Sequence, residues 1–295
     1  MMLMKIISGS SNLSFAKDLA QRFNSELIDV QLTKFDNGEK RVKILDSVQD
    51  EEVIIVQSFS HPADEHIIEF LLISDALERM GAKQVEAIIP WYGYSLQDKV
   101  FNDGEPLSAK VVANLISNSH VHQVSLLDVH NTSIAGFFSV PTYHLSALEL
   151  FITHAKNNFD LSQAVVVSPD FGGLKRSAQL AKALKIDLLN IEKTRNLQTG
   201  EIIKMELHGD VKDKVALIFD DAIVSGGTAI EAAEILKKSG AKEAHFLATH
   251  GLLVKDAKDK LQASLIDSIL VSNSIFHQDL PSKIKILDCT KLLIK

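Results

Sequence analysis

Short, β-branched apolar segments alternate with longer amphipathic segments along the whole chain. Nine runs have the length and composition of buried strands, namely residues 4–9, 53–59, 85–92, 123–129, 164–170, 187–193, 215–221, 243–250 and 268–273. Between them, four segments carry apolar residues at helical spacing, namely 63–81, 106–118, 174–184 and 228–239. This alternation predicts an α/β fold in which helices cover parallel sheets.

The strand and helix series runs twice. It extends from residue 1 to about 146 and starts again at about 147, and no low-complexity linker marks the join. We therefore predict two similar parallel-sheet α/β domains, 1–146 and 147–295. Gly81 and Gly240 follow two of the predicted helices, where a left-handed cap residue is expected.

One segment departs from the strand and helix alternation. Two weaker strand patterns, 26–32 and 41–45, flank the polar stretch "TKFDNGEK". An Asn-Gly pair between two strand patterns is a strong hairpin signal. The pattern predicts a β-hairpin with its turn at Asn37-Gly38.

Composition narrows the classes of partner. The chain has 295 residues, 46% hydrophobic content and a formal net charge of −7. It has no dense Lys/Arg cluster, so we expect neither nucleic acid nor membrane as a partner. No apolar run reaches the ~18 residues of a membrane span. With a single cysteine, Cys289, no disulfide can form within the chain, and we expect a reducing, cytoplasmic location.

Chemically active side chains gather where predicted strands end. Ligands of open α/β sheets bind beyond the carboxyl ends of the strands. The residues at these ends are Asp128, His130, Asp170, Lys193, Arg195, Asp220 and Asp221.

The stretch "IFDDAIVSGGT" (218–228) combines two acids with a turn of small residues that opens a helix. Free N–H groups and the helix dipole favour a phosphate at the turn, Ser225 to Thr228. Carboxylates accept hydrogen bonds from vicinal hydroxyls, so Asp220 and Asp221 suit a sugar diol. Ribose 5-phosphate would fit both halves. A turn in which the acids only cap the helix is the alternative, but capping needs one acid.

A second stretch, "SPDFGG", repeats this arrangement with Asp170, Gly172 and Gly173. Asp170 suits Mg²⁺, and the glycines suit a diphosphate at the helix start. Alone, Asp-x-Gly-Gly is a common turn. Lys193 and Arg195 are compatible either with a solvated surface or with closure over a transferring phosphoryl group.

Seven motifs, in order and over nearly the whole chain, resemble the ribose-phosphate diphosphokinase family. They are "KFDNGEKRV", "IIPWYGYSLQDK", "GEPLSAKVVANL", "LLDVHNTSIAGFF", "SPDFGG", "EKTR" and "DDAIVSGGT". The "GEP", "EKTR" and "SGGT" forms are similar to the archaeal-type branch. The resemblance implies a type I phosphoribosyltransferase-like topology. It also implies that the anomeric hydroxyl of ribose 5-phosphate attacks the β-phosphorus of ATP, which gives 5-phosphoribosyl 1-diphosphate and AMP.

The resemblance further implies a role for each site residue. Ribose 5-phosphate would bind to Asp220, Asp221, Ser225, Gly226, Gly227 and Thr228. The diphosphate would lie against Asp170, Gly172 and Gly173, and Lys193 and Arg195 would be catalytic. ATP would contact Gln97, Asp98, Lys99 and His130, and a neighbouring subunit would supply Phe35, Asn37 and Glu39. Mg²⁺ would be the cofactor, with His130 and Asp170 as ligands. The adenine contacts from a neighbouring subunit imply a dimer-based homo-oligomer, which could be a tetramer or a hexamer. The Mg²⁺ site implies a metal-dependent enzyme.

Leu96 departs from the family pattern, which usually has Arg at this position before the "QD" pair. A leucine cannot replace a guanidinium that contacts phosphates. Two alternatives to an active synthetase therefore stay open. One is a non-catalytic or weakly active regulatory paralogue, and the other is a type I phosphoribosyltransferase, which usually has one α/β domain with a small hood.

Overall fold

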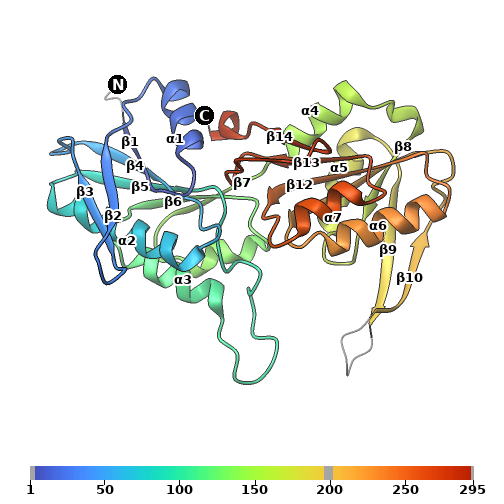
Figure 1. The fold of residues 1–295 in the computed structure, drawn as a ribbon, viewed down its shortest axis with the longest axis horizontal. Helices are drawn as coiled ribbons and strands as arrows, with labels where there is room; N and C mark the ends of the chain where they lie inside the picture. Colours follow the sequence, from blue (N-terminus) through green and yellow to red (C-terminus); the bar gives the residue numbers. More distant parts are fainter. Residues whose placement is uncertain (1–3, 196–201, 294–295) are drawn as a thin grey trace. The chain divides into compact units, whose positions relative to one another are not determined.

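The chain forms two compact units (Figure 1). A computed structural model describes residues 4–195 and 202–293, without the side chains of 193–195 and 202–205. The first unit contains the chain up to Ser146, together with Asn273–Phe276 and the segment from Cys289 onward. The second contains Ala147–Ser272 and His277–Asp288. The two late segments of the first unit were expected in the second domain.

Side-chain hydrogen bonds explain why these late segments belong to the first unit. The Asn12 amide donates to the carbonyl of Asn273 at 2.8 Å, and the Ser58 hydroxyl donates to the carbonyl of Ser274 at 2.5 Å. Arg22 donates to the hydroxyl of Thr290 at 2.7 Å. The hydrophobic pattern of the sequence cannot predict such long-range polar contacts, so it could not assign these segments to the first unit.

A five-stranded parallel sheet forms the centre of the first unit. Its strands are β1 (Lys5–Ser8), β4 (Glu52–Val56), β5 (Gln84–Ile89), β6 (Gln123–Leu127) and β7 (Thr142–Leu145), in the order β1-β4-β5-β6-β7. The helices are α1 (Leu13–Phe23), α2 (Ala63–Arg79) and α3 (Ser108–Ser117), with a 3₁₀ turn, η1 (Thr132–Phe137). The helix expected within 63–81 is confirmed as α2, whose Ile67, Phe70, Ile73 and Leu77 are buried, whereas Leu72 is exposed.

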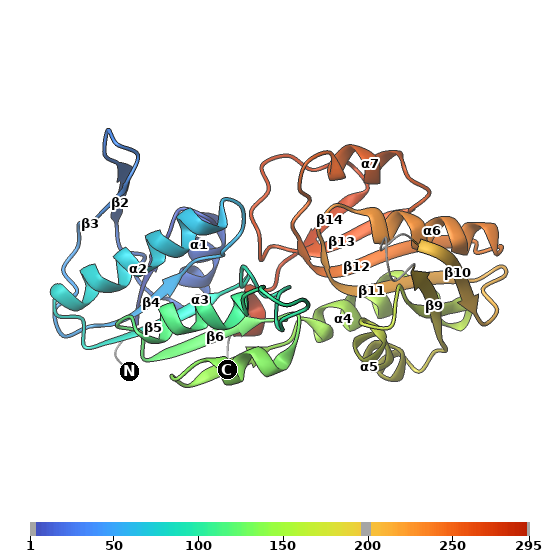
Figure 2. The ribbon, with the colours of Figure 1, turned by 90° about the horizontal axis from the view of Figure 1, so that it is seen from below.

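The predicted hairpin is present as β2 (Val30–Lys34) and β3 (Lys40–Ile44), which pair in antiparallel fashion. Its turn differs from the expected two-residue Asn-Gly turn. The Gly38 N–H donates to the carbonyl of Phe35 at 2.8 Å, and within 35–39 a positive φ, 90°, is found at Gly38 but not at Asn37. A two-residue turn of that type needs positive φ at both central positions. The turn therefore spans Phe35 to Gly38, and the hairpin projects from its unit (Figure 2).

The second unit contains a seven-stranded sheet in the order β10-β9-β8-β11-β12-β13-β14. Its strands are β8 (Ala164–Ser168), β9 (Leu188–Arg195), β10 (Ile202–His208), β11 (Val215–Ile223), β12 (Glu243–Gly251), β13 (Ser268–Ser272) and β14 (Ile284–Leu287). All neighbours are parallel except β9 and β10. The helices are α4 (Leu148–Asn158), α5 (Leu174–Leu184), α6 (Gly227–Lys238) and α7 (Ala257–Ala263), with 3₁₀ turns at η2 (Leu161–Gln163) and η3 (Thr290–Leu293), the latter in the first unit.

These sheets confirm the predicted α/β class with mainly parallel strands. Gly81 and Gly240 have φ of 78° and 90°, so both take the left-handed conformation expected after their helices. Within the two described ranges, no helix has both the length and the apolar character needed to cross a bilayer.

Candidate active site

The sheet of the second unit contains a topological switch point. The chain leaves β8 through α5 to reach β9 on one side, while β11 pairs with the other side of β8. In doubly wound sheets, ligands bind at the carboxyl ends of the two strands where the order reverses. Asp170 follows β8, and Asp220 and Asp221 lie on β11. Both predicted acidic motifs therefore flank the switch point.

The two adjacent acids lie within β11 and not beyond its end. β11 pairs with β8 as far as Ile218 and continues beside β12 to Ile223. Asp220 and Asp221 therefore occupy a section of strand that extends past β8. This extension places their carboxylates beyond the carboxyl end of β8, where a ligand is expected.

Arg176 holds the acid pair together. Its Nη1 atom lies 2.9 Å from Oδ1 of Asp220 and 2.9 Å from Oδ1 of Asp221. The two carboxylate side chains are 16% and 6% exposed, so their repulsion is poorly screened by water. When both carboxylates are ionised, the one guanidinium that they share offsets half of their negative charge. The sequence pattern did not single out Arg176, although a cation at the third position of the helix after Gly172-Gly173 was a usable signal.

Asp220 titrates far from its ordinary range. Burial, followed by the charge of Asp221, raises the pKa of Asp220 to about 7, although Arg176 acts in the opposite direction. A carboxyl group poised near neutrality at a sheet edge is typical of functional sites. The two carboxyls interact strongly, so they titrate as a pair.

The "SGGT" turn forms a cavity beside these acids. A space of about 110 Å³ is lined by Asp220, residues 222–229 and Phe246. Helix α6 begins at Gly227 after Gly226, which has a φ of 82°, and no side chain caps this end. The N–H groups of the first turn are therefore donors available to an anion.

Gly226 is required at this turn for two reasons. Its positive φ disfavours any residue with a Cβ. An added Cβ would also lie 3.0 Å from Cγ of Leu261, a buried residue of α7. The packing of α7 against the turn therefore restricts the conformation of the turn.

The Asp170 loop lies against the acid pair. Oδ1 of Asp170 accepts a hydrogen bond from the Gly173 N–H at 3.0 Å. A Cβ at Gly173 would lie 3.3 Å from Oγ of Ser168 and 3.5 Å from Oδ1 of Asp220. Gly173 therefore packs closely against Ser168 and lies within ordinary contact distance of Asp220 on β11. The structure brings together Asp170, Gly172, Gly173 and the acids of β11.

Lys193 and Arg195 lie at the end of β9, the strand next to β8. The backbone of Lys193 pairs with Met205 of β10, and that of Arg195 with Ile202. Their side chains lie outside the described residues, as do residues 196–201. Their expected catalytic contacts stay predictions.

The expected nucleotide residues lie in the first unit. Asn131 donates to Oδ2 of Asp98 at 2.8 Å, which joins the loop after β5 to the loop after β6 that carries His130. Gln97 accepts a hydrogen bond from Ser108, the first residue of α3. Nζ of Lys99 lies 5.1 Å from the ring centre of Phe101. The structure thus places Asp98 beside the loop that carries His130, whereas Gln97 contacts the start of α3.

The adenine residues expected from a neighbouring subunit form a separate group at the hairpin tip. Phe35, Asn37 and Glu39 are all exposed. The guanidinium of Arg41 lies 5.5 Å from the ring centre of Phe35. An exposed aromatic ring under a cation is suited to stacking on a planar base.

Two family models match the chain. One describes the N-terminal domain of ribose phosphate pyrophosphokinase and matches residues 4–119. The other describes a phosphoribosyl synthetase-associated domain and matches residues 190–295. A ribose-phosphate pyrophosphokinase of Bradyrhizobium diazoefficiens is 37% identical over 95% of this chain and 88% of its own length. The chain belongs to the ribose-phosphate pyrophosphokinase family.

Further relatives agree with this assignment. A ribose-phosphate pyrophosphokinase of Thermotoga maritima is 34% identical over 98% of this chain and 92% of its own length. The phosphoribosylpyrophosphate synthetase of Mycobacterium smegmatis has the same fold, with a TM-score of 0.92 and 30% identity over 98% of this chain and 96% of that one. The predicted ribose-phosphate pyrophosphokinase family and enzyme class, a transferase of nucleotide biosynthesis, are therefore confirmed. These relatives are bacterial and do not support the expected likeness to the archaeal-type branch.

The metal prediction is tested by the donor groups present. Within the described ranges, no group of three His, Cys, Asp or Glu residues converges as an all-protein metal site. Mg²⁺ usually takes one or two protein carboxylates and completes its shell with water and substrate phosphates. Asp170 fits that role, whereas the imidazole of His130 matches a hard ion poorly. In this member of the ribose-phosphate pyrophosphokinase family, the donor groups fit a magnesium ion that takes one protein carboxylate and fills its other positions with water and phosphate oxygens.

Proposed function

We propose that this chain transfers the diphosphoryl group of ATP to the anomeric hydroxyl of ribose 5-phosphate, which gives 5-phosphoribosyl 1-diphosphate and AMP. The observation that carries the proposal is the buried acid pair on β11, held by Arg176 beside an uncapped helix N-terminus. An anion site and a pair of hydrogen-bond acceptors at one sheet edge match the two ends of a sugar phosphate.

In this proposal Asp220 and Asp221 accept hydrogen bonds from the ribose hydroxyls, and Ser225 to Thr228 bind the 5-phosphate. The cavity of about 110 Å³ at this turn supports the assignment. Ionised carboxylates accept these hydrogen bonds more strongly than protonated ones. The acid pair therefore orients the sugar ring and presents the anomeric hydroxyl.

The diphosphoryl group in transit would lie against Asp170, Gly172 and Gly173. Phosphoryl transfer asks the protein chiefly for positioning and for stabilisation of charge. Lys193 and Arg195 supply the positive charge in this proposal. When Mg²⁺ is bound, it neutralises phosphate charge, with Asp170 and, less favourably, His130 as its protein ligands.

ATP would be held by Gln97, Asp98, Lys99 and His130. Phe35, Asn37 and Glu39 would reach the adenine of a neighbouring subunit, so the proposed enzyme is a dimer-based homo-oligomer. Their exposure at a projecting hairpin supports a partner of this kind. A cytoplasmic location belongs to the proposal as well and rests on the single cysteine.

A coupled assay for AMP tests the proposal. The full chain is incubated with Mg-ATP and ribose 5-phosphate in the absence of any nucleobase, and AMP formation is followed. We expect AMP in proportion to ribose 5-phosphate. A phosphoribosyltransferase would form no AMP under these conditions. A non-catalytic paralogue would also form none, but it would still bind ribose 5-phosphate in calorimetry.

A further inference from the structure

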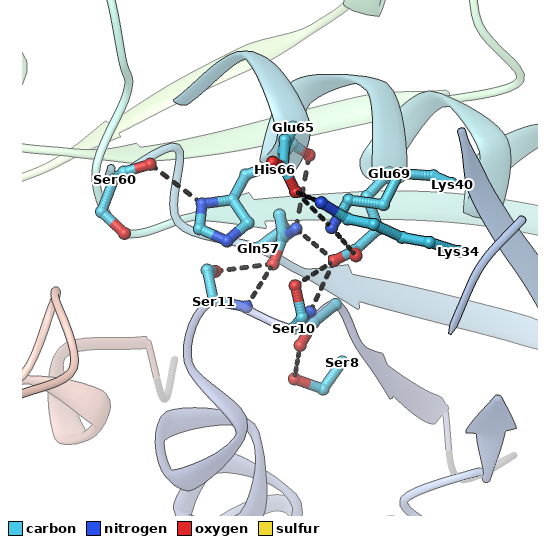
Figure 3. Close-up of polar contacts among 11 residues, drawn as sticks. Ser8, Ser10, Ser11, Lys34, Lys40, Gln57, Ser60, Glu65, His66 and Glu69 are labelled. Atoms are coloured by element: carbon cyan, nitrogen blue, oxygen red, sulfur yellow. Dashed lines mark hydrogen bonds and ion pairs between the residues drawn. The ribbon is translucent and has the colours of Figure 1, made fainter. Parts of the chain in front are cut away.

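The first unit contains a buried carboxylate that the proposed reaction does not use. Glu69 of α2 has a side chain that is 1% exposed. It accepts hydrogen bonds from the Ser10 N–H at 2.6 Å, the Ser10 hydroxyl at 2.7 Å and the Gln57 amide at 2.8 Å (Figure 3). Nζ of Lys40 lies 3.0 Å away. Three neutral donors and one cation satisfy the hydrogen-bonding capacity of this carboxylate, so it is not an open ligand site. We call Glu69 and these contacts a junction because they join several segments of the first unit.

The junction connects the hairpin to the central sheet. Ser10 lies in the loop between β1 and α1, and Gln57 follows β4 directly. Oε1 of Gln57 accepts from the N–H and the hydroxyl of Ser11 at 3.1 and 2.6 Å. Lys40 is the first residue of β3. One carboxylate therefore links the start of β3 to the carboxyl ends of two sheet strands.

Two lysines face each other where the strands of the hairpin meet its turn, and both are paired with acids of α2. Lys34 and Lys40 are cross-strand partners in the last pair before the turn. Like charges opposite one another destabilise an antiparallel pair. Glu65 and Glu69 lie one turn apart on α2 and pair with them: Lys34 with Glu65 at 2.8 Å, and Lys40 with Glu65 and Glu69 at 3.3 and 3.0 Å.

The inner pair differs from the outer pair in burial. The side chains of Lys40 and Glu69 are 15% and 1% exposed, whereas those of Lys34 and Glu65 are 49% and 41% exposed. Exposed pairs contribute little because water and salt screen them. Removing one partner of a buried, hydrogen-bonded pair has a much larger effect.

Both members of the inner pair stay ionised at neutral pH. Burial acts to lower the pKa of Lys40, but the hydrogen bonds and charges of Glu69 and Glu65 outweigh it and raise that pKa. Burial acts to raise the pKa of Glu69, but the Ser10 hydrogen bonds and Lys40 outweigh it and lower that pKa.

We propose that Lys40 and Glu69 are the positioning pair that fixes the hairpin tip, residues 35–39, for binding adenine. The role of Phe35, Asn37 and Glu39 in this statement rests on the proposed function, whereas the anchoring contacts do not. The pair acts through the hairpin and touches no reacting atom. Its loss should therefore weaken ATP binding and leave the chemical step intact.

The test compares Lys40→Met with Lys34→Met in the full chain. Amide hydrogen exchange is measured across the hairpin, 30–44, and across Glu52–Val56 of β4, together with the KM values and kcat of the AMP assay. We expect Lys40→Met to speed hairpin exchange about tenfold and to raise the KM for ATP about tenfold, the scale of one lost charge-assisted hydrogen bond. Exchange in β4, kcat and the KM for ribose 5-phosphate should not change. Lys34→Met should behave like the wild type, and Lys40→Arg should retain most of the anchoring.

Lys40→Met leaves the charge of Glu69 buried, so a second variant guards against loss of folding. The double variant Lys40→Met/Glu69→Gln removes both charges, and its hairpin should be as loose as that of Lys40→Met. The proposal is overturned if hairpin exchange in both variants equals that of the wild type. It is also overturned if Lys34→Met loosens the hairpin equally, or if the hairpin loosens while the KM for ATP stays constant. If the wild-type chain forms no AMP, the proposed function fails, and hairpin exchange still decides whether the pair holds the tip.

Discussion

At the scale of single residues, the acid pair on β11 shows which part of the site can be predicted from the sequence. Two adjacent acids after a buried strand predict a site because their repulsion must be compensated. The structure supplies the compensation through Arg176, at 2.9 Å from each carboxylate. Arg176 belongs to helix α5, 44 positions before Asp220 in sequence. The need for a partner was readable from the sequence, but its identity depended on the tertiary fold.

The raised pKa of Asp220 predicts a pH dependence of ribose 5-phosphate binding. Binding favours the ionised carboxylate, so affinity should fall by about tenfold per pH unit as pH drops below about 7. Calorimetry between pH 5.5 and about 8.5 measures the profile. Asp220→Asn is the control: it should bind more weakly and keep only the dependence from the phosphate group, which ionises near ~6. An Asn variant with the full wild-type pH profile would contradict the assignment.

The raised pKa of Asp220 has the opposite effect on stability: a rise in pH strengthens ribose 5-phosphate binding but lowers the contribution of Asp220 to the free energy of unfolding. The pKa of Asp220 in the folded chain, about 7, lies above its ordinary value of 3.8. The folded state therefore holds more protons than the unfolded state between these values, and the contribution of Asp220 to the free energy of unfolding falls as pH rises through this window.

Lys193→Ala should separate catalysis from sugar binding. If Lys193 offsets charge that develops on the transferred group, turnover should fall by about two to four orders of magnitude. Ribose 5-phosphate affinity, measured by calorimetry, should stay within about twofold, since the proposed sugar site lies on β11 and α6 and not on β9. Unchanged turnover would remove Lys193 from the mechanism.

Leu96→Arg should improve the use of ATP. The Leu96 side chain is 40% exposed, so a longer side chain can extend without a steric clash. A guanidinium beside the nucleotide phosphates should lower the KM for ATP by about tenfold, which corresponds to one charge-assisted hydrogen bond. The coupled AMP assay provides the measurement, and Leu96→Met is a matched uncharged control. An equal gain in Leu96→Met would show that charge is not the cause.

At the scale of elements, the hydrophobic pattern located the long buried strands and missed the short or polar ones. β7 has four residues, and Tyr143 in it is exposed. Helix α1 has a clear apolar face, but its capping signal, Asn12 accepting from the Phe15 N–H, lies in a polar turn after β1. Helix α7 has only seven residues. Short elements are stabilised by tertiary packing and carry little periodicity of their own.

The glycine turn before α6 predicts a sharp loss on substitution. Gly226→Ala must adopt a left-handed φ and displace Leu261, which together should lower the free energy of unfolding by about 2 kcal/mol. Ribose 5-phosphate affinity should fall as well, because the first turn of α6 shifts. Urea unfolding and calorimetry measure the two effects. Gly104→Ala is a control with a comparable φ, 89°, but with open space around an added Cβ, so it should show the backbone cost alone.

At the scale of the whole molecule, the first unit depends on the end of the chain. Deleting residues 289–295 removes the Thr290 hydroxyl that binds Arg22 and the Cys289 N–H that donates to Asn273 at 2.9 Å. We expect lower hydrogen-exchange protection in β1 and α1, while β11 and β12 keep theirs. Arg22→Met in the intact chain isolates one of these contacts and should show a smaller loss in the same places. Uniform loss over both units would contradict this division.

The path of the chain also limits how the molecule can be divided. The polypeptide passes from one unit to the other four times, at Ser146, Ser272, Phe276 and Asp288. No single cut in the chain separates the two units. A fragment that ends at Ser146 would lack Asn273–Phe276 and the segment from Cys289 onward, which belong to the first unit. The first unit therefore takes residues from both ends of the chain, so it should be produced as part of the full chain.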